Sequence, residues 1–544
     1  MKKASKVILA VIGVLILAFL YYYITIPALN IHSSGTWWFA IGGILVISVL
    51  IMLRKAIKEK QKIEISRSGI NIKVSGAAKI GFGIAAIAAV VLLIGTILSS
   101  PIVNAKKYQK LMTVQESDFT KDITQVDYNT IPILDKDSAA ILGNRKMGSM
   151  VDMVSQFEVS DDYTQINVNN TPVRVTPLEY ASGIKWLTNQ SKGIPAYMKI
   201  DMATQDTECV KLSEGIKYSK SEYFNRNVYR HLRFKYPTYI FSDQLFFEID
   251  DDGTPVWICP VKKYNIGLFG GETVGRVVIC NAITGECTNY AIEDVPKWVD
   301  KVYQAELLVD LYDYNGSLKH GYFNSVLGQK DCLQTTTGYN YITLDDDVWV
   351  YSGVTSVSGD ESNVGFVLMN QRTMETRFYK IEGATENSAM SSAEGQVQNL
   401  GYQATFPLLL NISDEPTYFM ALKDDAGLVK MYAMVNIQKY QWVATGDSIK
   451  ECEKSYNQLL KNNGLANVVE KDTKEISGVI KNVIPVNIEG SSHLYFAIEG
   501  KEEIFDVDLS DSKLLDIIKY DAGDTIKISY TEGDNPVKVS KIIK

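Results

Sequence analysis

Hydrophobic and polar positions divide the chain into a short apolar part and a long mixed part. The first apolar run ends with three tyrosines at 21–23, and the second begins with Trp37 and Trp38. Aromatic side chains at the ends of apolar runs are typical of the membrane–water interface. The first run has no charged residue over about 20 positions, enough helix to cross a hydrocarbon core of about 30 Å. The pattern predicts three transmembrane helices, at residues 7–26, 37–53 and 80–98.

Lysine and arginine positions predict how these helices are oriented. The N-terminus is basic, and the loop at residues 30–35 between the first two runs has no lysine or arginine. Cytoplasmic loops carry an excess of these residues, so the N-terminus and the loop 54–79 are expected inside the cell and everything after residue 100 outside. The basic residues of that loop are Arg54, Lys55, Lys58, Lys60, Lys62, Arg67, Lys73 and Lys79.

Two other interpretations of the apolar runs remain open. The first run could be a cleaved signal peptide, although it is long for one. The second run is short, and a re-entrant segment there would reverse the orientation of the rest of the chain. Within the loop, residues 63–74 alternate between apolar and polar about Ser68 and Gly69, which predicts a small hairpin.

Residues 101–193 are polar and mixed, and we interpret them as a stalk that leads into the folded region. Thr176 can cap a helix, Pro177 suits its first position, and Glu179 can complete a capping box. The sequence therefore predicts a helix that starts at Thr176.

Residues 194–465 repeat a loose unit of strand, polar turn, strand and capped helix. Each unit can form a hairpin with one apolar face that a helix covers. The predicted strand pairs and helices are 195–200, 209–212 and a helix from 219; 255–259, 277–280 and a helix at 295–302; 348–351, 366–370 and a helix at 386–399; and 416–419, 432–436 and a helix from 448.

The second unit turns through Ala282-Ile283-Thr284-Gly285-Glu286. This shape and turn resemble the PepSY-type repeat over residues 194–465. The third unit departs from the pattern, because its turn carries Arg372-Thr373-Met374. The resemblance implies an extracytoplasmic α+β module that binds other proteins or regulates a peptidase.

Residues 470–544 form a separate small domain by pattern. Three strands, a short helix and two more strands resemble an OB-fold barrel. Acidic residues outnumber lysines here, and the whole chain has a formal charge of −8, which argues against nucleic-acid binding. The predicted elements are strands at 476–486, 493–498 and 504–509, a helix at 512–518, and strands at 525–530 and 537–542.

Reactive and metal-ligating residues are sparse. The four histidines are far apart in the sequence, and no catalytic, cofactor or metal set emerges. Cys280 and Cys287 flank the second unit's turn and are expected opposite each other. They are a candidate disulfide, or alternatively two buried thiols.

Acidic clusters at 250–252 and 345–347 are interpreted as solvated turns. We therefore expect a membrane-anchored extracytoplasmic binding or scaffold protein of the bacterial cell envelope. Its expected partners are the lipid bilayer and other envelope proteins, without nucleic acid. The alternatives are a cell-wall-active hydrolase that uses the two acidic clusters, and a regulator of a secreted peptidase.

Overall fold

The computed structural model describes residues 2–58, 64–66, 69–71, 75–123, 131–169, 171–344, 346–356, 362–465, 473–488, 491–509, 514–531 and 536–543. The chain forms two compact units, Met1–Leu459 and Leu460–Lys544. Among the described residues, the first contains the N-terminal helices, four larger β-sheets and two two-stranded sheets, and the second contains a barrel.

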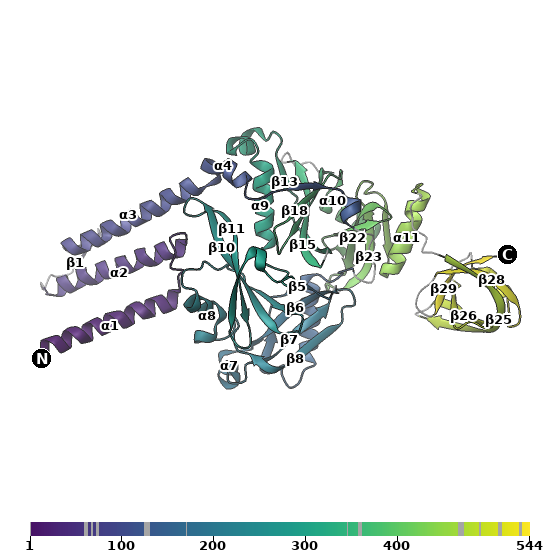
Figure 1. Cartoon of the computed structure of the whole chain (residues 1–544), viewed down its shortest axis with the longest axis horizontal. Helices are drawn as coiled ribbons and strands as arrows, with labels where there is room; N and C mark the ends of the chain where they lie inside the picture. Colours follow the sequence, from purple (N-terminus) through teal and green to yellow (C-terminus); the bar gives the residue numbers. More distant parts are fainter. Residues whose placement is uncertain are drawn as a thin grey trace. The chain divides into compact units, whose positions relative to one another are not determined.

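Three helices open the first unit: α1 (Lys2–Thr25), α2 (Ser34–Lys58) and α3 (Gly76–Ser99). They extend from the same side of the sheets, and α2 packs along α3 (Figure 1). Two of them, α2 over Ser34–Lys55 and α3, are long and apolar enough to cross a membrane. Among the described side chains of α1, the apolar stretch is the shorter Ile12–Thr25.

The predicted hairpin between the second and third apolar runs is present. Strand β1 (Glu64–Ser66) pairs antiparallel with β2 (Gly69–Asn71). Part of its expected turn, residues 67 and 68, lies outside the described residues.

Residues 101–193, predicted as a stalk, contribute strands to the sheets. Strand β3 (Gln115–Ser117) pairs in parallel with β18 (Thr376–Tyr379), and three strands within residues 157–180 belong to the first sheet. The described elements between α3 and β4, apart from β3, are the short helices α4 (Pro101–Gln109), α5 (Phe119–Asp122) and α6 (Lys136–Gly148).

Four larger sheets follow, and each contains the strands of one predicted unit; all their pairings are antiparallel except that of β3 with β18. The first is β4 (Phe157–Val159), β5 (Thr164–Val168), β6 (Thr171–Tyr180), β7 (Ile194–Asp201) and β8 (Thr207–Ile216); the second is β9 (Phe246–Ile249), β10 (Pro255–Ile266), β11 (Gly270–Asn281) and β12 (Cys287–Ala291).

The third sheet includes β3 and otherwise comes from the chain after α9. Two short strands, β16 (Ser362–Asn363) and β19 (Gly383–Ala384), pair beside it. The third sheet is β13 (Leu333–Thr335), β14 (Asn340–Leu344), β15 (Asp347–Ser356), β17 (Gly365–Asn370) and β18 (Thr376–Tyr379); the fourth is β20 (Gln403–Ala404), β21 (Leu408–Ile412), β22 (Glu415–Lys423), β23 (Val429–Asn436) and β24 (Val443–Gly446).

The sheets stack because their middle strands are apolar on both faces. In β10, Trp257 faces a core shared with the first sheet, and its neighbour Ile258 faces a core shared with the third. In β15, Val350 faces that second core, whereas Trp349 faces a core shared with the fourth sheet. Alternate residues of a strand point to opposite faces, so one hydrophobic run fills two cores.

Helices fill the edges of these cores. Helices α8, α9 and α10 contribute to the first, second and third core respectively. The helical segments are α7 (Gly183–Asn189), η2 (Phe224–Arg226), α8 (Val228–Lys235), η3 (Ile292–Asp294), α9 (Ala305–Ser317), η4 (Asn324–Gly328), α10 (Glu386–Gln396) and α11 (Ile449–Asn462).

Three of the hairpin turns share one hydrogen-bonding pattern. In the turn at 281–286, the Asn281 Oδ1 accepts from the backbone N–H groups of Ile283 and Thr284, and the Thr284 Oγ1 accepts from the Glu286 N–H. The turns at 201–206 and 370–375 repeat these bonds, with Asp201 and Asn370 in the first position. The third unit therefore departs in sequence but not in backbone geometry.

Three predicted helices are wrong. Thr176 lies inside β6, whose residues pair with β5 and β7. Pairing on both sides overrides the local capping signal. The helix predicted from 219 begins only at Val228, where Asn227 caps it. The helix predicted at 295–302 is replaced by turns, and α9 begins at Ala305. The helices predicted near 386 and 448 are present.

The second unit contains a closed five-stranded barrel. Its order is β25-β26-β27-β29-β28, with β27 and β29 parallel. Strand β25 closes the barrel, because its first half pairs with β28 and its second half with β26. The elements are β25 (Thr473–Ile488), β26 (Ser491–Ile498), β27 (Ile504–Asp508), η5 (Leu515–Lys519), β28 (Thr525–Thr531) and β29 (Val537–Ile543).

Candidate functional site

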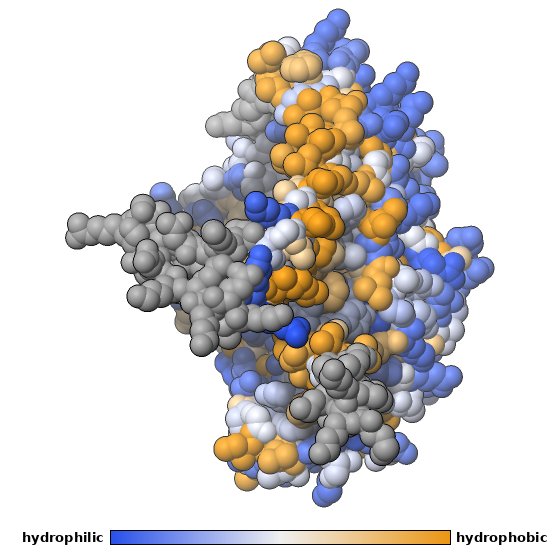
Figure 2. Space-filling model, turned by 90° about the vertical axis from the view of Figure 1, so that its left-hand side faces the viewer, coloured by the Kyte–Doolittle hydropathy of each residue, from blue (hydrophilic) through white to orange (hydrophobic). Residues whose placement is uncertain are grey.

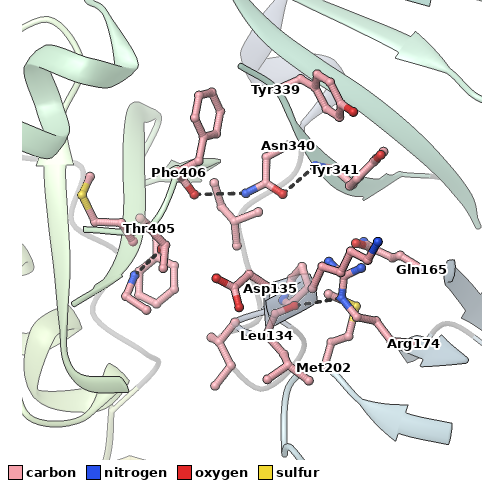
Figure 3. Close-up of a pocket in the computed structure, with 17 residues that line it drawn as sticks. Leu134, Asp135, Gln165, Arg174, Met202, Tyr339, Asn340, Tyr341, Thr405 and Phe406 are labelled. Carbon is pink, nitrogen blue, oxygen red and sulfur yellow. Dashed lines mark hydrogen bonds between the residues drawn. The ribbon is translucent and has the colours of Figure 1, made fainter. Parts of the chain in front are cut away.

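A cavity of about 210 Å³ opens between the first, third and fourth sheets of the first unit. Figure 3 shows Arg174 and Gln165 together on one wall, Tyr339 and Tyr341 above them, and Phe406 across from them. The chain brings these residues together from β6, β5, β14 with the residue before it, and the segment before β21. Both polar and aromatic side chains therefore line one small space, as ligand pockets commonly do.

Arg174 is the charged group of this cavity. It is 6% exposed, and its Nε donates to the Leu134 carbonyl oxygen at 3.1 Å. The structure gives Arg174 no ion pair among the described residues. Burial lowers the pKa of its guanidinium, but an arginine stays charged in a protein. Asp135 and Asp137 act electrostatically on this guanidinium and raise its pKa, but neither forms an ion pair with it, and a buried cation of this kind favours an anionic ligand.

Gln165 adds a second donor beside Arg174. It is 1% exposed, and its Nε2 has no hydrogen-bond partner among the described residues. The carboxylate at the rim, Asp135, already pairs with Lys423 from the fourth sheet. Asn340 fixes the aromatic side of the cavity, because its Nδ2 donates to the Phe406 carbonyl at 3.1 Å. The free hydrogen-bonding capacity is thus on the Arg174 wall.

A network of buried charges lies behind this wall. The Glu248 carboxylate accepts the backbone N–H groups of Asp300 and Lys301 at 3.1 and 2.9 Å. The Lys301 Nζ lies 4.3 Å from the centroid of the Tyr341 ring, which lines the cavity. Burial raises the pKa of Glu248 to about 7 and lowers the pKa of Lys301 to about 8. Asp300 has its pKa raised well above the usual value, again chiefly by burial.

The two acidic clusters named in the sequence have separate roles. The Asp250 Oδ1 accepts backbone N–H groups of Asp252 and Thr254, so it closes its own hairpin turn. Asp347 forms a two-bond ion pair with Arg372. Asp345 lies outside the described residues. The described residues of the two clusters do not line the cavity.

The two cysteines singled out from the sequence do face each other. Cys280 on β11 pairs with Cys287 on β12, and the neighbouring Asn281 N–H donates to the Glu286 carbonyl. The cysteines therefore occupy a non-hydrogen-bonded pair, where antiparallel strands approach most closely. Both are free thiols in this structure, and the disulfide stays a prediction.

His231 on α8 completes this cluster, and sequence reasoning missed it. The donor atoms of His231, Cys280 and Cys287 all lie within 4.8 Å of one another. The His231 Nε2 donates to the Gly285 carbonyl at 2.7 Å, because a carbonyl can only accept. A side chain at Gly285 would collide with Tyr218, whose ring packs on His231. Helix α8 reaches this turn only through the tertiary fold, so no local sequence pattern predicts that His231 joins the two cysteines.

The cluster changes the acidity of Cys287. The Cys280 thiol and then His231 lower the pKa of Cys287 to about 5 against the effect of burial. The same contact raises the pKa of Cys280, and Cys287 in turn raises the pKa of His231. A thiolate beside an imidazolium is the reactive form for thiol–disulfide exchange and is also a ligand for soft metal ions.

The comparisons with known proteins add no family assignment. No protein-family model matches the chain, and no curated protein matches it.

Proposed function

We propose that this chain is a membrane-anchored extracytoplasmic protein of the bacterial cell envelope that binds a small carboxylate. The anchor consists of α1, α2 and α3, with the lysine-rich segment 54–79 in the cytoplasm. Three crossings are supported by contacts that bring the end of α1, the start of α2 and the end of α3 to the same side of the folded region. The Ile26 carbonyl after α1 accepts from Arg233, Asn30 before α2 bonds to Thr238, and Ser99 at the end of α3 accepts from Leu268.

The sheets and the barrel are proposed to be PepSY-like and OB-like modules respectively. The repeated turns at 201–206, 281–286 and 370–375 support an internal repeat. The strand order of the barrel, with η5 between β27 and β28, supports the OB-like assignment. Modules of these kinds would give the protein surfaces for other envelope proteins, in keeping with a scaffold or a regulator of a secreted peptidase.

The buried Arg174 in the wall of a partly open cavity is the observation that carries the binding proposal. A carboxylate would neutralise this guanidinium through paired N–H···O bonds and would also satisfy the Gln165 Nε2. The aromatic side of the cavity would take a compact apolar group. Its volume of about 210 Å³ restricts the ligand to roughly the size of an amino acid derivative.

The binding proposal favours a binding protein over the alternative hydrolase. A hydrolase of this kind needs two carboxylates facing one substrate. Among the described carboxylates of the acidic clusters, Asp250 bonds to its own turn, Asp346 accepts from Asn167, and Asp347 pairs with Arg372. Glu248 and Asp300 do lie together, but they are 0% and 1% exposed and bond to backbone N–H groups.

Calorimetric titration of the full chain in detergent with benzoate and N-acetylalanine tests the proposal, with benzamide as the neutral control. We expect at least one carboxylate to bind and benzamide not to bind. Arg174→Met should weaken that binding at least about tenfold, since it removes a charge-assisted pair. Arg174→Lys keeps the charge without the fork and should bind with intermediate affinity.

Arg145→Gln, at an exposed position on α6, serves as the matched control for loss of an arginine. A thermal unfolding scan of each variant shows whether it is folded. Equal binding by a folded Arg174→Met variant, or binding of neither carboxylate by the wild type, would contradict the proposal.

A further inference from the structure

The end of α1 is held against α8. These contacts set the position of α8 relative to the surface of a membrane that α1 would cross. The Arg233 Nε donates to the Ile26 carbonyl at 3.1 Å, and the Phe234 ring packs against Tyr22 and Tyr23 of α1. Tyrosines at the end of a spanning helix lie at the level of the lipid headgroups. Helix α8 therefore lies at headgroup level if α1 crosses the membrane, as proposed above.

Large apolar side chains are exposed beside α8. On α7, Ile184 is 74% exposed and Leu187 is 62% exposed, and on η2, Phe224 is 62% exposed. Figure 2 looks onto the side from which the N-terminal helices project and shows an orange patch near its lower edge, at the height of α7 in Figure 1. Exposed apolar side chains at the level of the lipid headgroups can insert among the acyl chains of the membrane.

A second cluster of exposed apolar side chains, in and beside η4, lies near the end of α3 and supports the same position of the membrane surface. In and beside η4, Phe323 is 70% exposed and Leu327 is 80% exposed. The neighbouring Tyr322 packs with Tyr108 of α4, which directly follows α3. The Tyr108 hydroxyl donates to the Ser99 carbonyl at 2.7 Å, so this flank is also attached to a helix end. Apolar groups thus extend from both sides of the helix ends.

Between α7 and α8 lies an open pocket of about 440 Å³ that contains an arginine without a carboxylate partner among the described residues. The Arg230 guanidinium carbon lies 4.5 Å from the centroid of the Tyr23 ring, and its Nη1 donates to the Phe224 carbonyl. The Arg230 Nε is buried and has no hydrogen-bond partner in the part of the chain that the structure describes. The acidic residue of this pocket, Glu222, is already satisfied by the Tyr180 hydroxyl and the Trp186 Nε1, both at 2.7 Å.

We propose that this pocket binds the phosphate of an anionic membrane phospholipid, while α7 and η2 insert their apolar side chains beside α1. Arg230 supplies the positive charge, and Lys220, which pairs with Asp162, adds a second cation to the pocket wall. Guanidinium groups bind phosphate oxygens through paired N–H donors. The proposal rests on the membrane anchoring proposed above but not on the carboxylate cavity.

Trp186 provides a native reporter, because its ring packs against Tyr223 and Phe224. The full chain carrying Trp37→Phe and Trp38→Phe is reconstituted in phosphatidylcholine vesicles with brominated acyl chains. We expect bromine to quench part of the tryptophan emission, and Trp186→Phe to remove that quenching. Phe224→Ser should reduce it.

Headgroup binding is measured by mass spectrometry of phosphatidylglycerol retained by the purified full chain. Arg230→Gln should retain several-fold less of this lipid, Arg230→Lys should retain an intermediate amount, and Arg145→Gln should match the wild type. Excess inorganic phosphate should not displace the lipid, and displacement would indicate a site for free phosphate instead.

The outcomes separate this inference from the anchoring on which it rests. Absence of Trp186 quenching, or equal lipid retention by a folded Arg230→Gln variant, overturns the lipid site even if the chain remains in membranes. Release of the wild type from cell membranes by alkaline carbonate would instead contradict the anchor itself.

Discussion

At the scale of single residues, the Cys287 thiol is where the structure departs most from ordinary side-chain chemistry. Because Cys280 and His231 lower the pKa of Cys287 to about 5, we expect Cys287 to be a thiolate at neutral pH. In the reduced protein, we expect its alkylation by iodoacetamide to stay fast down to about pH 6, where an ordinary thiol of pKa near 8.5 has slowed greatly. His231→Gln should raise this pKa and slow the reaction at that pH.

Cys209 is the matched control, because it is also partly buried but has its pKa raised, mainly by burial. Peptide mass spectrometry of the alkylated protein distinguishes the two thiols. Alkylation of Cys287 that follows the pH profile of Cys209 would contradict the assignment. The sequence places Cys280 opposite Cys287, but His231 joins them only through the packing of α8.

At the scale of elements, the repeated turn explains why the third unit, whose turn differs in sequence from that of the second, has the same backbone geometry. The position after threonine has a positive φ in all three turns, at Gln205, Gly285 and Met374. Glycine adopts this conformation without strain, so the sequence of the second unit is the easiest to interpret. The bonds from the first side chain of the turn hold the same backbone where glycine is missing.

Gln205→Gly should therefore stabilise the protein. Glycine adopts the left-handed conformation without strain, which stabilises the folded state, but it also gives the unfolded chain more conformational entropy. The net effect should raise the free energy of unfolding by about 0.5–1 kcal/mol. Gln205→Ala keeps the strain and should bring no such gain. Denaturant unfolding of the full chain in detergent measures both, and a loss of stability in Gln205→Gly would show that the turn is unstrained.

Periodicity predicted most strands, whereas local capping signals predicted helices less well. The barrel strands were found to within a few residues, because short alternating runs between turns leave few other arrangements. Thr176 failed as a helix start because β6 is paired on both sides, which a local pattern cannot reveal. The Arg174 cavity could not be predicted, since its walls come from three sheets that meet only in the fold.

At the scale of the whole molecule, the account depends on which side of the membrane the sheets and the barrel occupy. Lysine-rich loops stay in the cytoplasm, so an odd number of crossings sends the later chain outward. The helix ends at Ile26, Asn30 and Ser99 contact α8, the segment after α8 and the β10–β11 turn, which agrees with three crossings in either orientation. Two crossings would place the sheets inside the cell and would remove the proposed envelope function.

Labelling of intact cells with a bulky membrane-impermeant maleimide tests this most directly, using Lys501→Cys in the barrel and Lys58→Cys in the basic loop. The unsubstituted chain corrects for native thiols, and cell lysis before labelling shows that both new cysteines can react. The account predicts that intact cells label Lys501→Cys but not Lys58→Cys. Labelling of Lys58→Cys with protection of Lys501→Cys would contradict it.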